Sequence, residues 1–143
     1  MTSVAFTDIV AHPLLPAEHD RDTAGFFAAA RRGELVLRFC TACDQVLHLP
    51  RQACFACGGN ESEWRPVPGR GHLYAWTVVT HQVHPAFAVP YTVVVVDVDG
   101  QPDGTRLVGR LAGEPVLTAG QPMRVRFDRA EDGTVVPNWE PGD

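Results

Sequence analysis

Four cysteines in two closely spaced pairs constrain the fold of this chain more than any other feature. Cys40 and Cys43 form one Cys-x-x-Cys pair, Cys54 and Cys57 form another, and ten residues separate the pairs. Each pair places two thiols on a tight turn, and two such turns together make a tetrahedral sulfur site that suits zinc. Because four thiolates leave no open coordination position, we expect one structural zinc ion per chain.

Other uses of the four thiols fit the sequence less well. A redox dithiol needs one Cys-x-x-Cys at the start of a helix in a βαβ unit, which no segment here supplies. Disulfides need an oxidising compartment, but the first residues, "MTSVAFTDIVAHPLLP", lack the basic and apolar stretches of a signal peptide. We therefore expect a cytoplasmic protein. Iron in a rubredoxin-like site would use the same four ligands and stays an open alternative.

The segments on either side of the cysteines divide the sequence into three predicted regions. Residues 1–33 should form an N-terminal arm and a helix, residues 34–66 the zinc ribbon, and residues 67–143 a β-barrel. Residues 1–21, the arm, are rich in proline and acidic residues, and we expect them to be extended. The segment "EWRPVPGRG" marks the boundary before the barrel, because two prolines and two glycines interrupt it.

A short helix is predicted in "DTAGFFAAARRG". Asp22 or Thr23 can cap its N-terminus, two arginines follow in the last turn, and Gly33 ends it. Phe26 and Phe27 are adjacent, so their side chains point about 100° apart on a helix and one core face cannot bury both well. The helix is therefore expected to pack either on its own chain or on a partner.

Five segments from residue 71 onward have the pattern of short β-strands: "GHLYAWTVVTHQV", "YTVVVVDVDG", "TRLVGRLAG", "MRVRFDR" and "TVVPNWE". In the first, Tyr74 and Trp76 share a face with Val78, as core residues would. In the third, Gly109 in mid-strand suggests a bulge or a tight bend. The strands leave no room for crossover helices, so the predicted fold class is mainly β, with a five-stranded OB-type antiparallel barrel after the helix and the ribbon.

The charge distribution argues against nucleic-acid binding, which an OB-type barrel would otherwise suggest. The net charge is −5 at pH 7, and only residues 31–70 are locally basic, with six arginines against four acidic residues. Binding to a phosphate backbone needs a cationic stripe, whereas the barrel segment is net negative. A single-stranded nucleic-acid binder is therefore kept only as the alternative of another class.

The sequence contains no set of residues that predicts catalysis by this chain. His81 and His84 lie three residues apart with no carboxylate nearby, so we interpret them as loop histidines rather than as a general base or a second metal site. An enzyme using this histidine loop is a further alternative. No run of 18 apolar residues is present, which excludes a membrane-spanning helix. The chain is expected to work by binding.

Several linked motifs resemble a known family. They are the helix and strand "FFAAARRGELVLRFC", the ribbon "CTACDQVLHLPRQACFACGG", and the segments "EWRPVPGRGHLYAWTVV" and "PYTVVVVDVD". This combination is similar to small proteins with an N-terminal helix, a rubredoxin-like zinc ribbon and a C-terminal OB-fold, which accompany thiolase-superfamily enzymes acting on acyl-CoA. The likeness covers about residues 15–140.

The resemblance implies an accessory subunit without catalytic residues of its own. Family members form hetero-oligomers with thiolase-like enzymes that carry the catalytic groups, and they stabilise the partner and shape its CoA or acyl entrance. The favoured partner is an aldolase that cleaves the CoA-linked side chain of a steroid or a long acyl substrate. An acyltransferase or a thiolase–synthase complex is the alternative.

Two sets of side chains are candidates for contacts within such a complex. Aromatic residues of the helix and of the loop "HPAFAVPY" are expected at the partner interface, namely Phe26, Phe27, Phe87 and Tyr91. Arginines of the basic stretch are expected to face CoA phosphates, namely Arg31, Arg51 and Arg70. Solvated surface arginines are the alternative interpretation of this second set.

Overall fold

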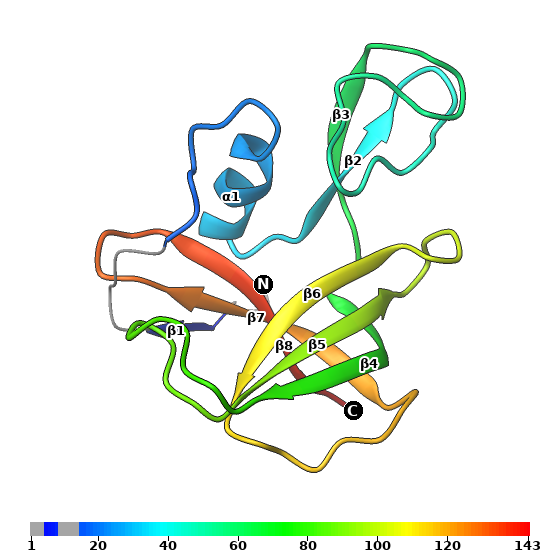
Figure 1. Cartoon of the computed structure of the whole chain (residues 1–143). Helices are drawn as coiled ribbons and strands as arrows, with labels where there is room; N and C mark the ends of the chain where they lie inside the picture. The colour runs from blue at the N-terminus through cyan, green and yellow to red at the C-terminus, as the bar shows by residue number, and fades with distance from the viewer. Residues whose placement is uncertain (1–4, 9–14) are drawn as a thin grey trace.

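The computed structural model of the chain describes residues 5–8 and 15–143. One helix and a two-stranded sheet lie on the same side of a larger, barrel-like sheet (Figure 1). The predicted fold class, mainly β with one N-terminal helix, is confirmed. In the described part of the chain, no helix has the length and apolar character needed to cross a membrane.

Helix α1 (Ala24–Arg31) is shorter than predicted, and it starts differently. Thr23 occupies the N-cap position, but its side chain makes no capping bond. Its hydroxyl instead donates to the carbonyl oxygen of Ala17 at 3.3 Å, while the carbonyl of Asp20 accepts the first N–H of the helix at 2.8 Å. Gly33 ends the helix as predicted, with a φ of 73° that glycine adopts without strain.

The ribbon is built on two antiparallel strands, β2 (Val36–Cys40) and β3 (Ser62–Pro66). The side chain of Trp64 on β3 packs against α1 at Gly25, where an added Cβ would overlap the indole ring. The absence of a side chain at this position therefore lets the ribbon and the helix lie against each other.

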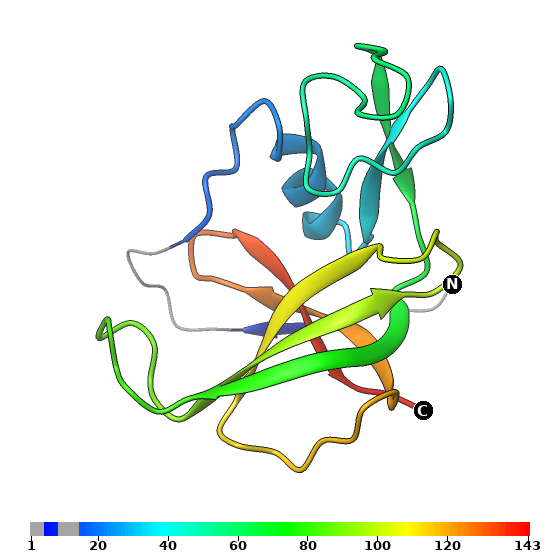
Figure 2. The ribbon, with the colours of Figure 1, turned by 45° about the vertical axis from the view of Figure 1, so that its right-hand side comes forward.

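Five antiparallel strands form the barrel, as predicted. They are β4 (Arg70–Val79), β5 (Tyr91–Val98), β6 (Arg106–Ala112), β7 (Pro122–Arg129) and β8 (Val135–Pro141). The strand order is β7-β4-β5-β6, and β8 pairs with the other edge of β7. The loop between β4 and β5 projects from the barrel on the side away from the ribbon (Figure 2).

A sixth strand, β1 (Phe6–Asp8), was not predicted as a strand and comes from the N-terminal arm. It pairs in parallel with the second half of β7, where Phe6 lies opposite Phe127, whereas β4 pairs with the first half of β7, from 122 to 124. The two strands thus share one edge of β7. The rest of the predicted extended arm, residues 1–4 and 9–14, lies outside the described residues.

The core lies inside the barrel and continues under the helix and the base of the ribbon. Along β5 every second residue is buried, with Val94 and Val96 at 0% exposure. Trp139 of β8, 2% exposed, is one of the largest buried side chains of this cluster, and Phe26 of α1 packs against the same cluster. The helix therefore covers part of the barrel.

Two aromatic residues of β4 contradict the prediction that they belong to the core. Tyr74 is 54% exposed and Trp76 is 40% exposed, whereas Leu73 is buried. The pairing of β4 with β5 shifts between Leu73 and Ala75, which leaves Tyr74 as the extra residue of a β-bulge. A strict alternation read from the sequence therefore fails at this point.

The bulge predicted at Gly109 is also wrong, because β5 and β6 pair without interruption through this residue. Gly109 instead allows β8 to lie close across β6. A Cβ at this position would be 2.8 Å from Cδ1 of Trp139 and 3.0 Å from its backbone nitrogen. The glycine thus serves the close approach of two strands.

Candidate metal centre and adjoining surfaces

The first pair of cysteines lies on a tight turn at the end of β2. The N–H of Asp44 donates to the carbonyl of Cys40 at 2.9 Å, and the N–H of Cys40 donates to the carbonyl of Gln45 at 2.9 Å. Asp44 has a φ of 60°, which reverses the chain direction after Cys43. These backbone bonds turn both thiols toward the same point.

The second pair lies on an equivalent turn. The N–H of Gly58 donates to the carbonyl of Cys54 at 2.8 Å, and the N–H of Cys54 donates to the carbonyl of Gly59 at 2.8 Å. Gly58 has a φ of 77°, which explains the glycine after Cys57. Two further N–H groups point at sulfur, from Ala56 to Cys54 and from Gly59 to Cys57, each at 3.4 Å.

All four sulfur atoms lie within 4.8 Å of one another. The Sγ atoms of Cys40 and Cys57 are 3.6 Å apart, and so are those of Cys43 and Cys54. A tetrahedral zinc ion with Zn–S distances of about 2.3 Å requires sulfurs about 3.8 Å apart, so the arrangement fits zinc closely. With four thiolate ligands the ion would have no position left for a substrate, and its role would be structural.

The surroundings of the thiols shift the pKa values of Cys54 and Cys43 in opposite directions. Hydrogen bonds from the backbone N–H groups of Cys57 and Ala56 lower the pKa of Cys54 to about 7. The N–H of Gln45 lowers the pKa of Cys43, but hydrogen bonds with the neighbouring thiols and burial outweigh it and raise this pKa to about 12. Metal binding must therefore displace a proton from Cys43, so it competes with protons.

The three arginines predicted to contact CoA lie on three different elements. Arg31 at the end of α1 is paired with Glu18, with 2.5 Å between Nη2 and Oε2. Arg51 in the ribbon lies over the ring of Phe55, 5.4 Å from its centroid. Arg70 begins β4. The structure therefore gives Arg31 a carboxylate partner and does not gather the three side chains on one element.

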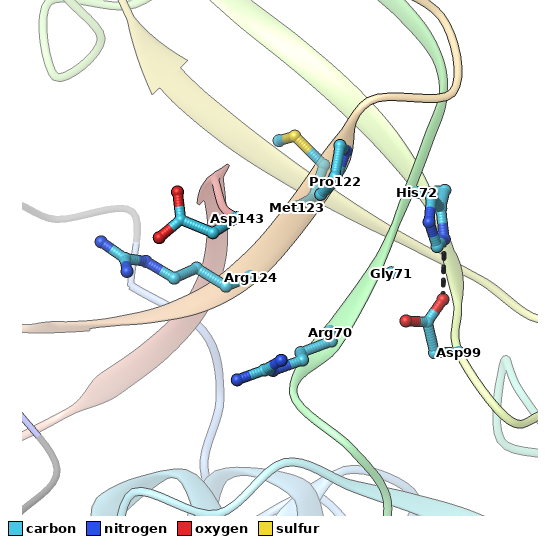
Figure 3. Close-up of a pocket in the computed structure, with 8 residues that line it drawn as sticks. All are labelled: Arg70, Gly71, His72, Asp99, Pro122, Met123, Arg124 and Asp143. Carbon is cyan, nitrogen blue, oxygen red and sulfur yellow. Dashed lines mark hydrogen bonds and ion pairs between the residues drawn. The ribbon is translucent and has the colours of Figure 1, made fainter.

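Arg70 lines a shallow hollow of about 220 Å³ on the barrel surface (Figure 3). In the same hollow, Nδ1 of His72 lies 2.8 Å from Oδ1 of Asp99. The sequence interpretation missed this pair, although the hairpin turn between β5 and β6 makes it possible. None of the residues lining the hollow is a serine, threonine or cysteine, so the pair has no nucleophile to activate there.

The four aromatic candidates for the partner interface form two separate pairs. Phe26 and Phe27 meet edge to face in α1, with ring centroids 5.2 Å apart. Phe87 and Tyr91 lie at the loop between β4 and β5, with centroids 6.1 Å apart. Because this loop projects away from the ribbon, the structure does not place it beside the metal site (Figure 2).

Two models of known families match consecutive parts of the chain. Residues 27–63 match the family model described as "ChsH2, rubredoxin-like zinc ribbon domain", and residues 64–128 match "ChsH2, C-terminal OB-fold domain". The zinc-ribbon match and the gathered thiols together confirm the predicted zinc cofactor.

Individual relatives cover most of the chain. A solved chain of the "Ltp2-ChsH2(DUF35) aldolase" is 32% identical, with a TM-score of 0.76 over 91% of this chain and 98% of that chain. A "Probable enoyl-CoA hydratase alpha subunit" from Thermomonospora curvata is 33% identical over 124 residues, 85% of this chain but only 38% of the relative. A DUF35 protein of unknown function from Sulfolobus solfataricus, 10% identical with a TM-score of 0.51 over 77% of each chain, shares the fold alone.

Proposed function

The chain belongs to the DUF35 family that includes ChsH2, and on that premise we propose that it is a non-catalytic, zinc-binding accessory subunit of an acyl-CoA enzyme. The observation that carries the proposal is the match over nearly the full length of both chains to the ChsH2 chain of an aldolase complex. The partner would be a thiolase-superfamily enzyme that supplies the catalytic groups.

The proposed reaction of the complex is an aldol cleavage of the CoA-linked side chain of a steroid or a long acyl substrate. The aldolase named above supports the reaction type, and the relative named as an enoyl-CoA hydratase subunit supports a CoA thioester as the substrate class. An acyltransferase or a thiolase–synthase complex is the alternative within the same class of proteins. The reaction products distinguish them, because only an aldolase breaks a carbon–carbon bond next to a hydroxyl-bearing carbon.

Within the complex, the four cysteines would hold a zinc ion that fixes the ribbon, and the ribbon would fix α1. The two aromatic pairs, Phe26 with Phe27 and Phe87 with Tyr91, would contact the partner. CoA phosphates would meet the three arginines Arg31, Arg51 and Arg70. Of these, Arg51 and Arg70 are the stronger candidates, since Arg31 already has a carboxylate partner.

Reconstitution with a thiolase-superfamily partner tests this role. The Ltp2 subunit of the aldolase named above would be assayed alone, with this chain, and with a Cys54→Ser variant, on a β-hydroxyacyl-CoA thioester. We expect no turnover by this chain alone and a clear gain in the activity or thermal stability of Ltp2 in the mixture. Substantial cleavage by this chain alone would contradict the accessory role.

A single-stranded nucleic-acid binder is the second candidate because of one observation. Tyr74 and Trp76 are exposed on the barrel, where aromatic side chains could stack on bases. The negative charge of the barrel segment still opposes this function. Titration with a single-stranded oligonucleotide at low salt distinguishes the two candidates, since binding lost in Trp76→Ala would favour the second.

A further inference from the structure

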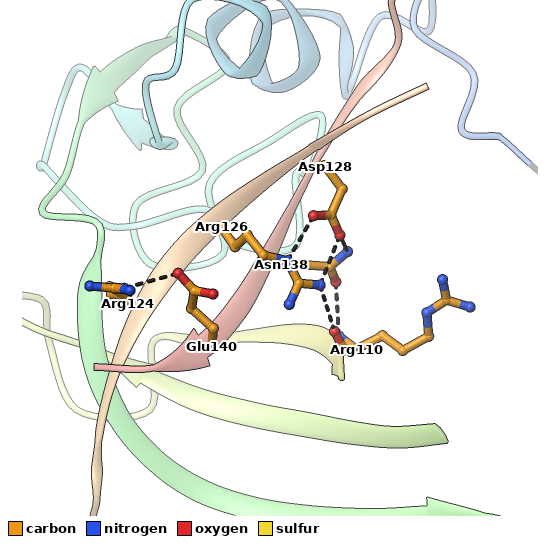
Figure 4. Close-up of polar contacts among 6 residues, drawn as sticks. All are labelled: Arg110, Arg124, Arg126, Asp128, Asn138 and Glu140. Carbon is orange, nitrogen blue, oxygen red and sulfur yellow. Dashed lines mark hydrogen bonds and ion pairs between the residues drawn. The ribbon is translucent and has the colours of Figure 1, made fainter. Parts of the chain in front are cut away.

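Side chains, rather than backbone pairing, join β6 to β8 where the barrel closes. Among the described strands, β6 pairs only with β5, and β8 only with β7. At Arg110 of β6, the backbone N–H donates to Oδ1 of Asn138 at 2.8 Å, and Nη2 of Arg126 donates to the backbone carbonyl at 3.3 Å (Figure 4). Both backbone groups of Arg110 are therefore held in place.

The acidic groups beside this closure already have partners. Asp128, 3% exposed, accepts two hydrogen bonds from Arg126, at 2.7 and 2.9 Å, and one from Nδ2 of Asn138 at 2.8 Å. Glu140 pairs with Arg124 at 2.9 Å. Each carboxylate is thus neutralised by an arginine of its own chain.

The side chain of Arg110 is different, because it has aromatic neighbours but no carboxylate. Its guanidinium lies over the rings of Phe87 and Tyr91, 5.0 and 5.7 Å from their centroids. It extends away from Asp128 and Asn138 (Figure 4). None of the ion pairs formed by the described residues includes Arg110. The charge is therefore held by stacking on aromatic rings and remains open to an outside anion.

A groove of about 540 Å³ lies at this guanidinium and runs from β6 toward β8. Ala86, Ala88 and Ala112 line it and leave room beside the arginine. Next to it, the outer face of the β4–β5–β6 sheet carries valines, with Val108 at 63% exposure and Val95 opposite it. An ion pair formed at Arg110 would thus have apolar groups on one side, which limit the access of water and strengthen the pair.

We propose that this groove binds an aspartate or glutamate side chain of the partner subunit, with its carboxylate on Arg110. The inference rests on the proposed function and names the chemistry of the contact. Four charged residues line the groove: Arg110, Arg126, Asp128 and Glu140. Asp128 is paired with Arg126 and Glu140 with Arg124, so among the described residues the charge of Arg110 is left without a carboxylate. This single charge matches one carboxylate rather than a doubly charged phosphate. The planar guanidinium also presents paired N–H donors that fit a carboxylate.

Arg106, four residues away on the same strand β6, supplies a matched control. It lies over the ring of Tyr74 of β4, 3.7 Å from its centroid, so each of these two arginines of β6 has a tyrosine ring next to its guanidinium. However, Nε of Arg106 already donates to Oδ1 of Asp97 at 2.8 Å. Of these two arginines, Arg110 alone forms no ion pair with a described residue, so Arg110 rather than Arg106 should matter to an acidic partner surface.

Measuring the affinity of the chain for the Ltp2 subunit tests the proposal. The titrations are done at low and at high salt with the wild type, Arg110→Ala, Arg110→Lys and Arg106→Ala. We expect Arg110→Ala to weaken binding about 30-fold, as loss of an interface anchor does. Arg110→Lys should weaken it less, and Arg106→Ala less than about 3-fold. The wild type should lose more affinity on adding salt than Arg110→Ala does. Zinc content and thermal unfolding of the free variants establish that each is folded.

Each other outcome has a definite meaning. If the wild type binds and Arg110→Ala binds equally well, the groove is not the contact, and the accessory role stands without it. If the wild type does not bind, the accessory role itself is overturned, together with its proposed contact. If millimolar CoA shifts the NMR signal of the Arg110 Nε–H in the free chain, the groove serves a phosphate ligand and the inference is wrong.

Discussion

The ribbon and the barrel of this chain are stabilised in different ways. The barrel, with the helix and the base of the ribbon, has a cluster of fourteen buried hydrophobic residues. The outer part of the ribbon has a cluster of three, Cys40, Leu47 and Cys54, two of which belong to the metal site. Phe55 and Leu49 remain exposed there. The metal therefore takes the place of a hydrophobic core in the ribbon, whereas buried hydrophobic side chains stabilise the barrel.

Loss of one thiol should have the largest effect, and it should act on the ribbon alone. We expect Cys54→Ser to abolish the ordered ribbon, because metal binding supplies most of its folding free energy, on the order of 10 kcal/mol in zinc-finger peptides. The barrel should stay folded. Amide hydrogen exchange would show lost protection between residues 40 and 61 and retained protection in β4 to β8. Ala56→Ser, between Cys54 and Cys57, is the control. Unfolding of the barrel along with the ribbon would contradict the view that the two regions are stabilised separately.

The converse change lies in the barrel core. Trp139→Ala removes a side chain that is 2% exposed and should lower the free energy of unfolding by about 3–5 kcal/mol. The zinc content of the protein that remains folded should be unchanged. Denaturant unfolding and metal analysis measure the two effects separately. As a control, Trp76→Ala, at a side chain that is 40% exposed, should lower the free energy of unfolding far less. Release of zinc from Trp139→Ala under native conditions would show that the stabilities of the ribbon and the barrel are coupled.

The smallest effect concerns the joint between the two regions. Gly25→Ala would drive a Cβ into the indole of Trp64 and should destabilise the packing of α1 on the ribbon by about 1 kcal/mol. In a Trp64→Ala background the clash is gone, so the same change should stabilise the helix, since alanine favours helix over glycine. Thermal unfolding of the four proteins of this cycle measures the reversal of sign. An equal effect in both backgrounds would place the cost elsewhere than in Trp64.

Features that depend on short stretches of sequence could be predicted. The spacing of the cysteines indicated the zinc site, while the β-branched residues of β5 and the alternation of β7 indicated barrel strands, because turns and pleats involve neighbouring residues. The exposure of Tyr74 could not be predicted, since the bulge depends on how β4 pairs with β5. The role of Gly109 depends on Trp139, and the position of the Arg110 guanidinium depends on Phe87 and Tyr91. Such contacts between distant segments leave no local pattern.

The shared edge of β7 has a consequence for how the protein is made. Phe6 pairs with Phe127, so β1, which precedes the barrel strands in the sequence, can take its place only after β7 has left the ribosome. Until then, the half of β7 that β4 does not reach offers unpaired N–H and carbonyl groups to any neighbouring chain. Such sequence-distant pairing slows folding and lengthens the time during which a nascent chain can aggregate. The chain should therefore be most prone to aggregate while it is being synthesised close to other nascent chains.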